Sequence, residues 1–283
     1  MPTTTIDGLV TRFEVTGSGP PLLLLSPGGF NATLGNWRSH GIYRRTKLVA
    51  ALEQRYTCIA FDKREAGLSG GRLERVTWRH YAEQGLGLLE ALDIPRAALL
   101  GGCVGCSIAA ALAVEHPERV SGVVLYSPAG GPRYRMTQHD RFARHADFVQ
   151  DEGLAAVVAQ ARETTAGFSE DPRVGPWATV LRWDEDFARA YAAQDPGRYR
   201  ALLTGLARTL FDRDTVPGPE PEDLLRCDVP ALVVPGQDAS HATSAARYLE
   251  ECLPAAQYWD VPVAGQTEET APARVLEFLD SLG

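Results

Sequence analysis

The sequence has no cluster of positive charge and no amino-terminal secretion signal. Its 28 Lys and Arg residues are outnumbered by 36 Asp and Glu residues, and the formal net charge of -8 makes nucleic acid a poor partner. Residues 1–7 carry neither the basic start nor the apolar stretch of a signal peptide. We therefore expect a cytoplasmic protein that acts on a small-molecule substrate and not on nucleic acid.

The sequence also lacks a convincing membrane span and an even set of cysteines. Residues 97–114 contain no charge and have about the length of a membrane helix, but the glycine-rich segment around Cys103 at their centre is typical of a turn. We expect no membrane association, no metal and no cofactor, and the sequence leaves a homodimer open. In a chain without a signal, an odd cysteine set indicates reduced thiols: Cys58, Cys103, Cys106, Cys227 and Cys252.

Short apolar runs alternate with helical patterns along most of the chain. The 283 residues, 45% of them hydrophobic, are enough to bury a sizeable core. The pattern around Asp7 and Gly8 predicts a β-hairpin over residues 3–15. The order predicts an α/β fold whose mostly parallel sheet is flanked by helices on both faces. The runs that predict later strands are residues 22–25, 58–61, 97–100, 120–126, 231–234 and 258–263.

One long interval interrupts this alternation. Between the strand that ends near Ser127 and the strand that begins near Pro230, the pattern is amphipathic and helical. We expect a core built from residues 1–131 and 223–283, with a helical cap or lid at residues 132–222 above the carboxyl edge of the sheet.

Gly101 and Gly105 flank Cys103 two positions away on either side, between an apolar run and a helical pattern. A covalent nucleophile needs such a sharp turn at a helix amino terminus. The segment resembles the G-x-S-x-G nucleophile elbow of the α/β-hydrolase superfamily, with Cys in place of Ser as in dienelactone hydrolase-like members. The resemblance implies an α/β-hydrolase sheet, Cys103 as nucleophile and Asp238 as acid. Three more segments resemble that family: residues 62–69, 116–120 and 235–238.

The catalytic histidine of the family has no counterpart at its usual place. Gln266 follows Asp238 at the usual spacing and stands where the resemblance implies histidine, and an amide takes no proton at neutral pH. A partly ionised thiol attacks without a strong base, but a thioester still needs an activated water. We therefore favour His241, on the loop after the acid, as the base, titrating in the ordinary range of about 6 to 7; a surface histidine without a catalytic role is the alternative.

The segment that would hold the oxyanion also departs from the family, which often has His-Gly after the third strand. Here residues 26–31 read Ser-Pro-Gly-Gly-Phe-Asn, and Pro27 has no N–H to donate. We predict that the oxyanion hole consists of the backbone N–H groups of Val104 and of Gly28 or Gly29.

Three residues are candidates for substrate binding. Arg133 and Tyr134 enter the predicted cap above the pocket, where they would grip a carboxylate, although a solvated charge is the alternative. Trp37 would line an apolar acyl pocket, although tryptophan more often packs in a core. A pocket role stays open for three histidines: His40, His139 and His145.

The predicted function is hydrolysis of a small ester, lactone or thioester through an acyl-Cys103 intermediate. A lyase, cyclase or acyl transferase on the same fold, or a catalytically silent binding protein, remains an alternative. Cys103 and Cys106 also form a C-x-x-C pair at a helix start, which leaves a dithiol redox role open.

Overall fold

The computed structural model describes residues 2–283, and within them one eight-stranded sheet forms the centre of the molecule. The hairpin of β1 (Thr3–Ile6) and β2 (Leu9–Thr16) is antiparallel, as predicted, and β2 pairs antiparallel with β4. All other neighbours are parallel, in the order β1-β2-β4-β3-β5-β6-β7-β8. The remaining strands are β3 (Pro21–Leu25), β4 (Thr57–Phe61), β5 (Ala97–Gly102), β6 (Val120–Tyr126), β7 (Ala231–Val234) and β8 (Ala256–Tyr258).

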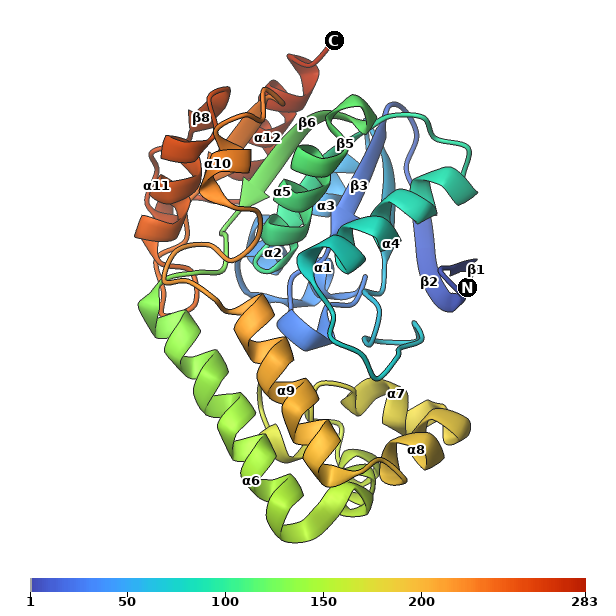
Figure 1. The fold of residues 1–283 in the computed structure, drawn as a ribbon. Helices are drawn as coiled ribbons and strands as arrows, with labels where there is room; N and C mark the ends of the chain where they lie inside the picture. Colours follow the sequence, from blue (N-terminus) through green and yellow to red (C-terminus); the bar gives the residue numbers. More distant parts are fainter. Residues whose placement is uncertain (1) are drawn as a thin grey trace.

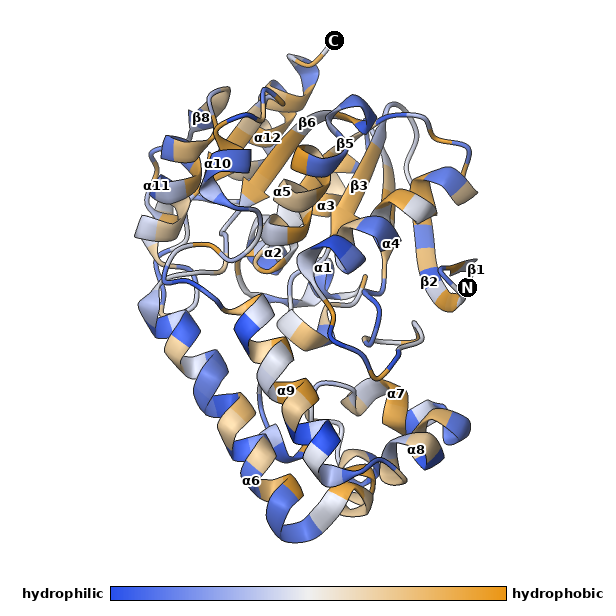
Figure 2. Ribbon diagram, in the orientation of Figure 1, coloured by the Kyte–Doolittle hydropathy of each residue, from blue (hydrophilic) through white to orange (hydrophobic). Residues whose placement is uncertain are grey.

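Helices cover both faces of the sheet (Figure 1). Successive side chains of a strand point to opposite faces, so Leu23 and Leu25 of β3 enter one hydrophobic cluster while Leu22 and Leu24 enter the other. The first cluster includes α4 (Trp78–Ala91), α5 (Gly105–Glu115) and α11 (Thr243–Cys252), and the second includes α1 (Asn36–Ser39), α2 (Gly41–Thr46), α3 (Leu48–Leu52) and α12 (Thr270–Asp280). The central strands are mainly apolar (Figure 2) because both of their faces are buried.

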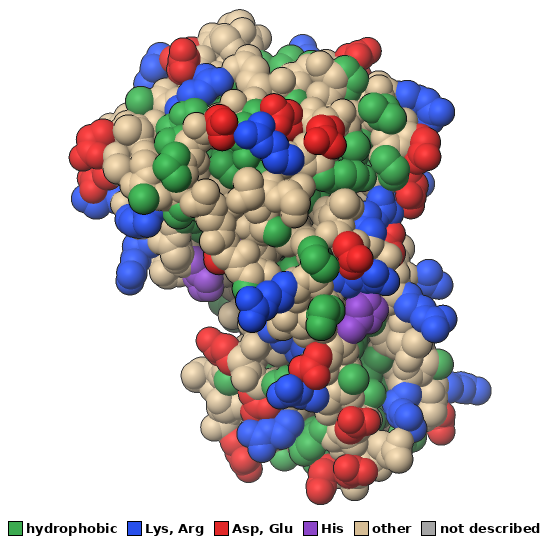
Figure 3. All heavy atoms as spheres, turned by 90° about the vertical axis from the view of Figure 1, so that its left-hand side faces the viewer, with side chains coloured by type: hydrophobic (Ala, Val, Ile, Leu, Met, Phe, Trp, Pro, Cys, Tyr) green, Lys and Arg blue, Asp and Glu red, His purple; other side chains and the backbone are tan. Residues whose placement is uncertain are grey.

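The segment between β6 and β7 is helical, and residues 127–230, all of which are described, contain no strand. Its long helix α6 (Pro132–Glu163) is kinked at Gly153, where φ is 81°, and it packs beside α9 (Pro196–Leu210) (Figure 1). Figure 3 shows a narrowing of the surface between this helical insert (residues 132–222) and the larger sheet-containing part. The helices that begin in the insert are α6 (Pro132–Glu163), α7 (Ala178–Trp183), α8 (Glu185–Ala192), α9 (Pro196–Leu210) and α10 (Pro221–Leu224).

The last strand lies earlier than residues 258–263, where the sequence pattern predicts it. β8 covers Ala256–Tyr258, and the Trp259 N–H still donates to the Val233 carbonyl at 3.0 Å. Pro262 has no N–H for a sheet hydrogen bond, and a 3-10 turn follows at Val263–Gly265. The apolar run therefore crosses from a strand into a turn. Among residues 2–283, no helix combines the length and apolar character needed to cross a membrane.

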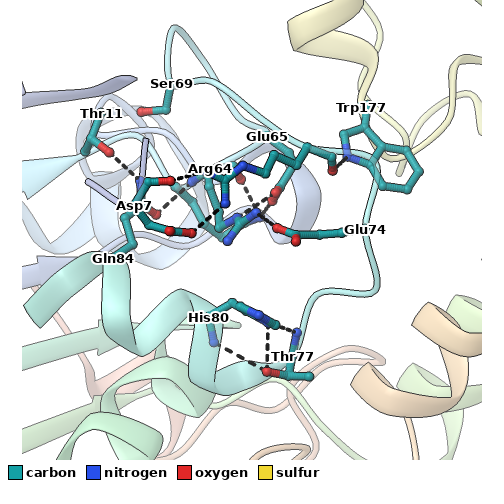
Figure 4. Close-up of polar contacts among 12 residues, drawn as sticks. Asp7, Thr11, Arg64, Glu65, Ser69, Glu74, Thr77, His80, Gln84 and Trp177 are labelled. Atoms are coloured by element: carbon teal, nitrogen blue, oxygen red, sulfur yellow. Dashed lines mark hydrogen bonds and ion pairs between the residues drawn. The ribbon is translucent and has the colours of Figure 1, made fainter. Parts of the chain in front are cut away.

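The loop after β4 holds buried charges and also contacts the insert (Figure 4). Glu65 has φ of 66°, the left-handed conformation that glycine adopts without strain. Arg64 donates from Nε to Glu65 Oε1 at 2.8 Å and also pairs with Glu74. Trp177 of the insert donates from Nε1 to the Arg72 carbonyl at 2.9 Å. These contacts fix the insert above the carboxyl edge of the sheet.

Candidate active site

Cys103 occupies a tight turn between the end of β5 and the start of α5. Its φ of 53° is a left-handed conformation that side-chain-bearing residues rarely adopt, and its N–H donates to the Tyr126 carbonyl at 3.2 Å. Gly105 allows this turn because a Cβ there would lie 1.9 Å from the Leu25 carbonyl oxygen. The turn holds the thiol at the carboxyl edge of the sheet, next to the amino terminus of α5.

His241 lies on the loop after β7, and Asp238 shapes that loop. The Asp238 carboxylate accepts hydrogen bonds from the N–H groups of Ser240 at 2.8 Å and His241 at 3.0 Å. His241 Nδ1 lies 2.9 Å from both carboxylate oxygens, so this nitrogen carries the proton and Nε2 is the reactive nitrogen. In the loop that follows β6, the N–H of Gly130 donates to the Ser240 carbonyl at 3.0 Å. The loop therefore presents one fixed ring orientation.

The imidazole and the thiol shift each other's pKa. Burial raises the pKa of the Cys103 thiol. Four interactions lower it: the charge of His241, its hydrogen bond, and the N–H groups of Gly28 and Val104. Together they exceed the effect of burial, so the pKa lies below its ordinary value. Burial lowers the pKa of His241, but the thiolate and the Asp238 carboxylate outweigh it and raise the pKa to about 9. Between these two pKa values the pair exists as thiolate and imidazolium.

In the resting pair, the Cys103 thiolate and Asp238 raise the pKa of His241 above the range expected from the sequence. An isolated loop histidine would lose its proton at about pH 6 to 7, whereas the pKa of His241 next to the thiolate is about 9. The first proton to leave the pair on raising the pH is therefore that of the Cys103 thiol. His241 Nε2 is buried and meets no oxygen or nitrogen partner among the described residues, so its partner in the resting pair is the Cys103 sulfur.

Two backbone N–H groups converge on the Cys103 sulfur, those of Gly28 and Val104. Gly28 has φ of 123°, and a Cβ there would lie 2.2 Å from Asn36 Nδ2. Asn36 in turn donates to the Pro27 carbonyl at 2.7 Å and so fixes the loop. The structure thus brings together two of the three predicted oxyanion donors at the thiol, and Gly29 lines the same cavity.

Gln266 lies apart from this group. Its side chain is fully buried, its Nε2 donates to the Pro235 carbonyl at 2.8 Å, and its Oε1 accepts from the Tyr126 hydroxyl at 3.0 Å. Both ends of the amide are therefore occupied inside the core. The predicted catalytic position of Gln266 is corrected to a structural one that joins β6, the end of β7 and the turn before α12.

A cavity of about 220 Å³ lies over the thiol, and we call it the first cavity. Its polar groups come from both parts of the molecule: Lys63 from the loop after β4, and Tyr134, Gln138 and Arg141 from α6. Aromatic and apolar side chains fill the rest of the wall: Phe30, Trp78, Tyr81, Leu210 and Phe211. The cavity thus combines an apolar wall with two cations.

Of the three predicted substrate-binding residues, one lines the first cavity and two do not. Tyr134 is buried and lines the first cavity, whereas Arg133 is exposed to solvent. Residues at i, i+4 and i+7 share one helix face, and Tyr134, Gln138 and Arg141 follow that spacing. The helical period, applied to α6, would have found Arg141. Trp37 packs edge-on against Tyr43 at a ring separation of 5.0 Å in the core, so its predicted pocket role is corrected.

Lys63 is a buried cation that the sequence did not single out. Its Nζ lies 4.1 Å from the centre of the Tyr81 ring and donates to the Arg64 carbonyl at 3.0 Å. Burial lowers its pKa to about 8, although the neighbouring Glu65 opposes the shift. Lys63 Nζ also lies 3.6 Å from Glu65 Oε2, and its side chain lines the first cavity.

The other candidate residues lie in the structure as follows. His40 lines the first cavity, whereas His139 contacts the Phe211 carbonyl and His145 the Tyr199 hydroxyl. Cys106 is buried and its sulfur donates to the Gly101 carbonyl at 3.2 Å. All five cysteines are free thiols. Among residues 2–283, no group of three or more His, Cys, Asp or Glu side chains is arranged to hold a metal ion.

Comparisons with known proteins agree with this architecture. A family model described as "alpha/beta hydrolase fold" matches residues 21–204. The 2-hydroxymuconate semialdehyde hydrolase of Pseudomonas sp. is 31% identical to this chain, over 66% of this chain and 69% of the relative. A putative 2-succinyl-6-hydroxy-2,4-cyclohexadiene-1-carboxylate synthase of Bacillus subtilis is 28% identical, over 80% of each chain. The crystal structure of the enol-lactonase from Burkholderia xenovorans matches the fold with a TM-score of 0.63 at 22% identity, over 99% of this chain and 100% of that one. The chain belongs to the alpha/beta hydrolase family and is a hydrolase of that fold.

Proposed function

We propose that this protein hydrolyses small esters, lactones or thioesters through an acyl-Cys103 intermediate. The observation that carries the proposal is the arrangement of the Cys103 thiol, the His241 imidazole and the Asp238 carboxylate on neighbouring loops, with Nδ1 held 2.9 Å from the acid. A nucleophile, a base and a group that orients the base are the parts of a catalytic triad. The hydrolase name of the Pseudomonas relative supports the reaction class.

The chemistry follows from the protonation states of the pair. The Cys103 thiolate attacks the carbonyl carbon, and the oxyanion takes the two N–H groups of Gly28 and Val104 that otherwise meet the sulfur. The His241 imidazolium gives its Nε2 proton to the leaving oxygen or sulfur, and an acyl-Cys103 thioester remains. Neutral His241 then removes a proton from water, whose oxygen attacks the thioester carbon. The C–S bond breaks, the acid leaves, and the thiolate–imidazolium pair is restored.

The first cavity supports a narrower description of the substrate. Its aromatic wall of Phe30, Tyr81 and Phe211 favours a small apolar or unsaturated acyl group, and its cations Lys63 and Arg141 favour a carboxylate on that group. Arg141 donates to Gln138 Oε1 at 2.8 Å and is therefore held in place before a ligand arrives. We propose a carboxylate-bearing ester or lactone as the substrate class.

Burst kinetics with an activated ester test the proposal. Mixing the protein with a 4-nitrophenyl ester should release one equivalent of nitrophenol quickly, as Cys103 is acylated, and then continue at the slower rate of deacylation. A Cys103→Ala variant should fold normally and show neither phase, because the substitution removes the nucleophile and little volume. Turnover of the variant at the wild-type rate would refute the proposal.

A further inference from the structure

A second cavity, of about 430 Å³, reaches the thiol from another side. It lies between α2, the loop after β7 and the turn before α12, with Ile42, Gln237 and Val263 on its walls. It shares Gly28, His40, Cys103 and His241 with the first cavity, so the two cavities meet at the thiol–imidazole pair. Of the described residues that line it, none belongs to the helical insert.

The side chains around the second cavity leave this space open. The segment after β8 contributes Val263 to the second cavity, while the Gln266 side chain turns into the core and bonds to Pro235 and Tyr126. The imidazole comes instead from the loop after β7, where Asp238 holds it. The region beside α2, Gln237 and Val263 therefore remains open.

We propose that the second cavity is an acceptor site, which admits the hydroxyl compound that attacks acyl-Cys103. This inference rests on the proposed function. An acyl group on the sulfur occupies the first cavity, whose volume is about 220 Å³, beneath side chains of α6 such as Tyr134. The attacking molecule needs another path to the thioester carbon, and the second cavity provides one at the shared wall of Cys103 and His241.

The size and chemistry of the cavity define the acceptor. A water molecule takes up about 30 Å³ in the liquid, so a cavity of about 430 Å³ also holds a small polyol such as glycerol. Once the sulfur is acylated and the imidazole is neutral, the buried Nε2 of His241 is placed to take a hydroxyl proton. An alkyl amine is protonated at neutral pH, and the exposed Asp238 carboxylate at this cavity keeps it so. The acceptor class is therefore water and small alcohols.

The transfer step balances without any added reagent. The acceptor oxygen attacks the thioester carbon while its proton passes to His241 Nε2. The tetrahedral oxyanion is held by the N–H groups of Gly28 and Val104, and its collapse breaks the C–S bond. The electron pair returns to the Cys103 sulfur as thiolate, next to the imidazolium. Water yields the free acid and an alcohol yields a new ester, so the site gives the protein an acyl-transfer activity in addition to hydrolysis.

The test uses 4-nitrophenyl acetate with and without glycerol. The burst reports acylation, the steady state reports deacylation, and the ratio of glyceryl acetate to acetate reports acceptor choice. Val263→Trp and, separately, Ile42→Trp narrow the second cavity at partly exposed positions. Ser169→Trp, an exposed position on the first cavity, is the matched control.

We expect Val263→Trp and Ile42→Trp to leave the burst rate within about twofold of wild type, to slow deacylation roughly tenfold and to lower the glyceryl ester ratio. The ratio does not depend on the fraction of folded protein, so partial misfolding does not imitate this result. Ser169→Trp should slow the burst and leave the ratio unchanged. Unchanged deacylation and product ratio in both second-cavity variants would overturn the inference alone, whereas absence of a burst in the wild type would overturn the proposed function with it.

Discussion

Replacing His241 with alanine removes the positive charge beside the Cys103 thiolate and leaves the rest of the turn in place. The thiol stays buried, and burial is the largest influence on its pKa and raises it. The N–H groups of Gly28 and Val104 still act on the sulfur, but they oppose burial less than the imidazolium does. The variant's thiol should therefore be mainly protonated at neutral pH.

The size of the effect follows from the thiolate fraction. An ordinary thiol with a pKa of about 8.5 is about 3% ionised at pH 7, and the lowered pKa of Cys103 makes its thiolate fraction larger than that. The alkylation rate follows the thiolate fraction, although a more basic thiolate is intrinsically more reactive. We expect His241→Ala to reduce the rate at pH 7, because the variant's thiolate fraction is smaller. In the wild type, a second change should occur near pH 9, where His241 loses its proton.

Iodoacetamide labelling followed by peptide mass spectrometry measures this rate at each pH. Cys252, whose pKa is raised by burial, serves as the internal reference, and His139→Ala, which changes a histidine bonded to the Phe211 carbonyl, is the control variant. A wild-type Cys103 that labels like Cys252 across the pH range, or a His241→Ala variant with the wild-type profile, would refute the ion pair.

Three further predictions concern the architecture and the first cavity. Gln266→His should leave hydrolysis unchanged and lower the free energy of unfolding by about 1 to 3 kcal/mol in thermal or urea denaturation, because the Tyr126 hydroxyl and Pro235 carbonyl lose their partner; a gain of hydrolysis would place residue 266 at the thiol. Gly105→Ala should cost about 3 kcal/mol or more, since its Cβ would meet the Leu25 carbonyl oxygen at 1.9 Å, whereas Gly35→Ala, with its nearest contact at 3.9 Å, should be close to neutral in the same assay. Lys63→Met should raise KM about tenfold for a carboxylate-bearing ester and leave KM for a neutral ester of equal size unchanged, and the exposed Lys47→Met should alter neither; equal effects on both esters would remove Lys63 from anion binding.

The fold was predictable because its main signals are local. Strands buried on both faces read as uninterrupted apolar runs, as in Leu22 to Leu25, and the turns between them are marked by glycine and proline. The end of the sheet was less predictable, since Pro262 divides an apolar run that continues past β8 into a 3-10 turn. At this edge of the sheet, the N–H that Pro262 lacks decides where the strand pairing ends.

The site residues that directly follow parallel strands were predictable, because the order of the strands already brings these residues close together. Cys103 follows β5 and His241 follows β7, and the carboxyl ends of parallel strands meet at one edge of the sheet. Gln266, Arg133 and Trp37 required the direction of a side chain as well, and the structure turns these three into the core or the solvent. Lys63 gave no signal, because only packing against Tyr81 reveals that this amine is buried.

The central claim is that Cys103 carries the acyl group during turnover. Rapid quenching of the wild-type protein with an activated ester, followed by peptide mass spectrometry, tests it most directly. We predict an acyl mass increment on the peptide that contains Cys103, formed during the burst and lost at the rate of deacylation, and a longer-lived adduct in His241→Ala. Turnover without such an adduct, or an adduct confined to another residue, would contradict the account.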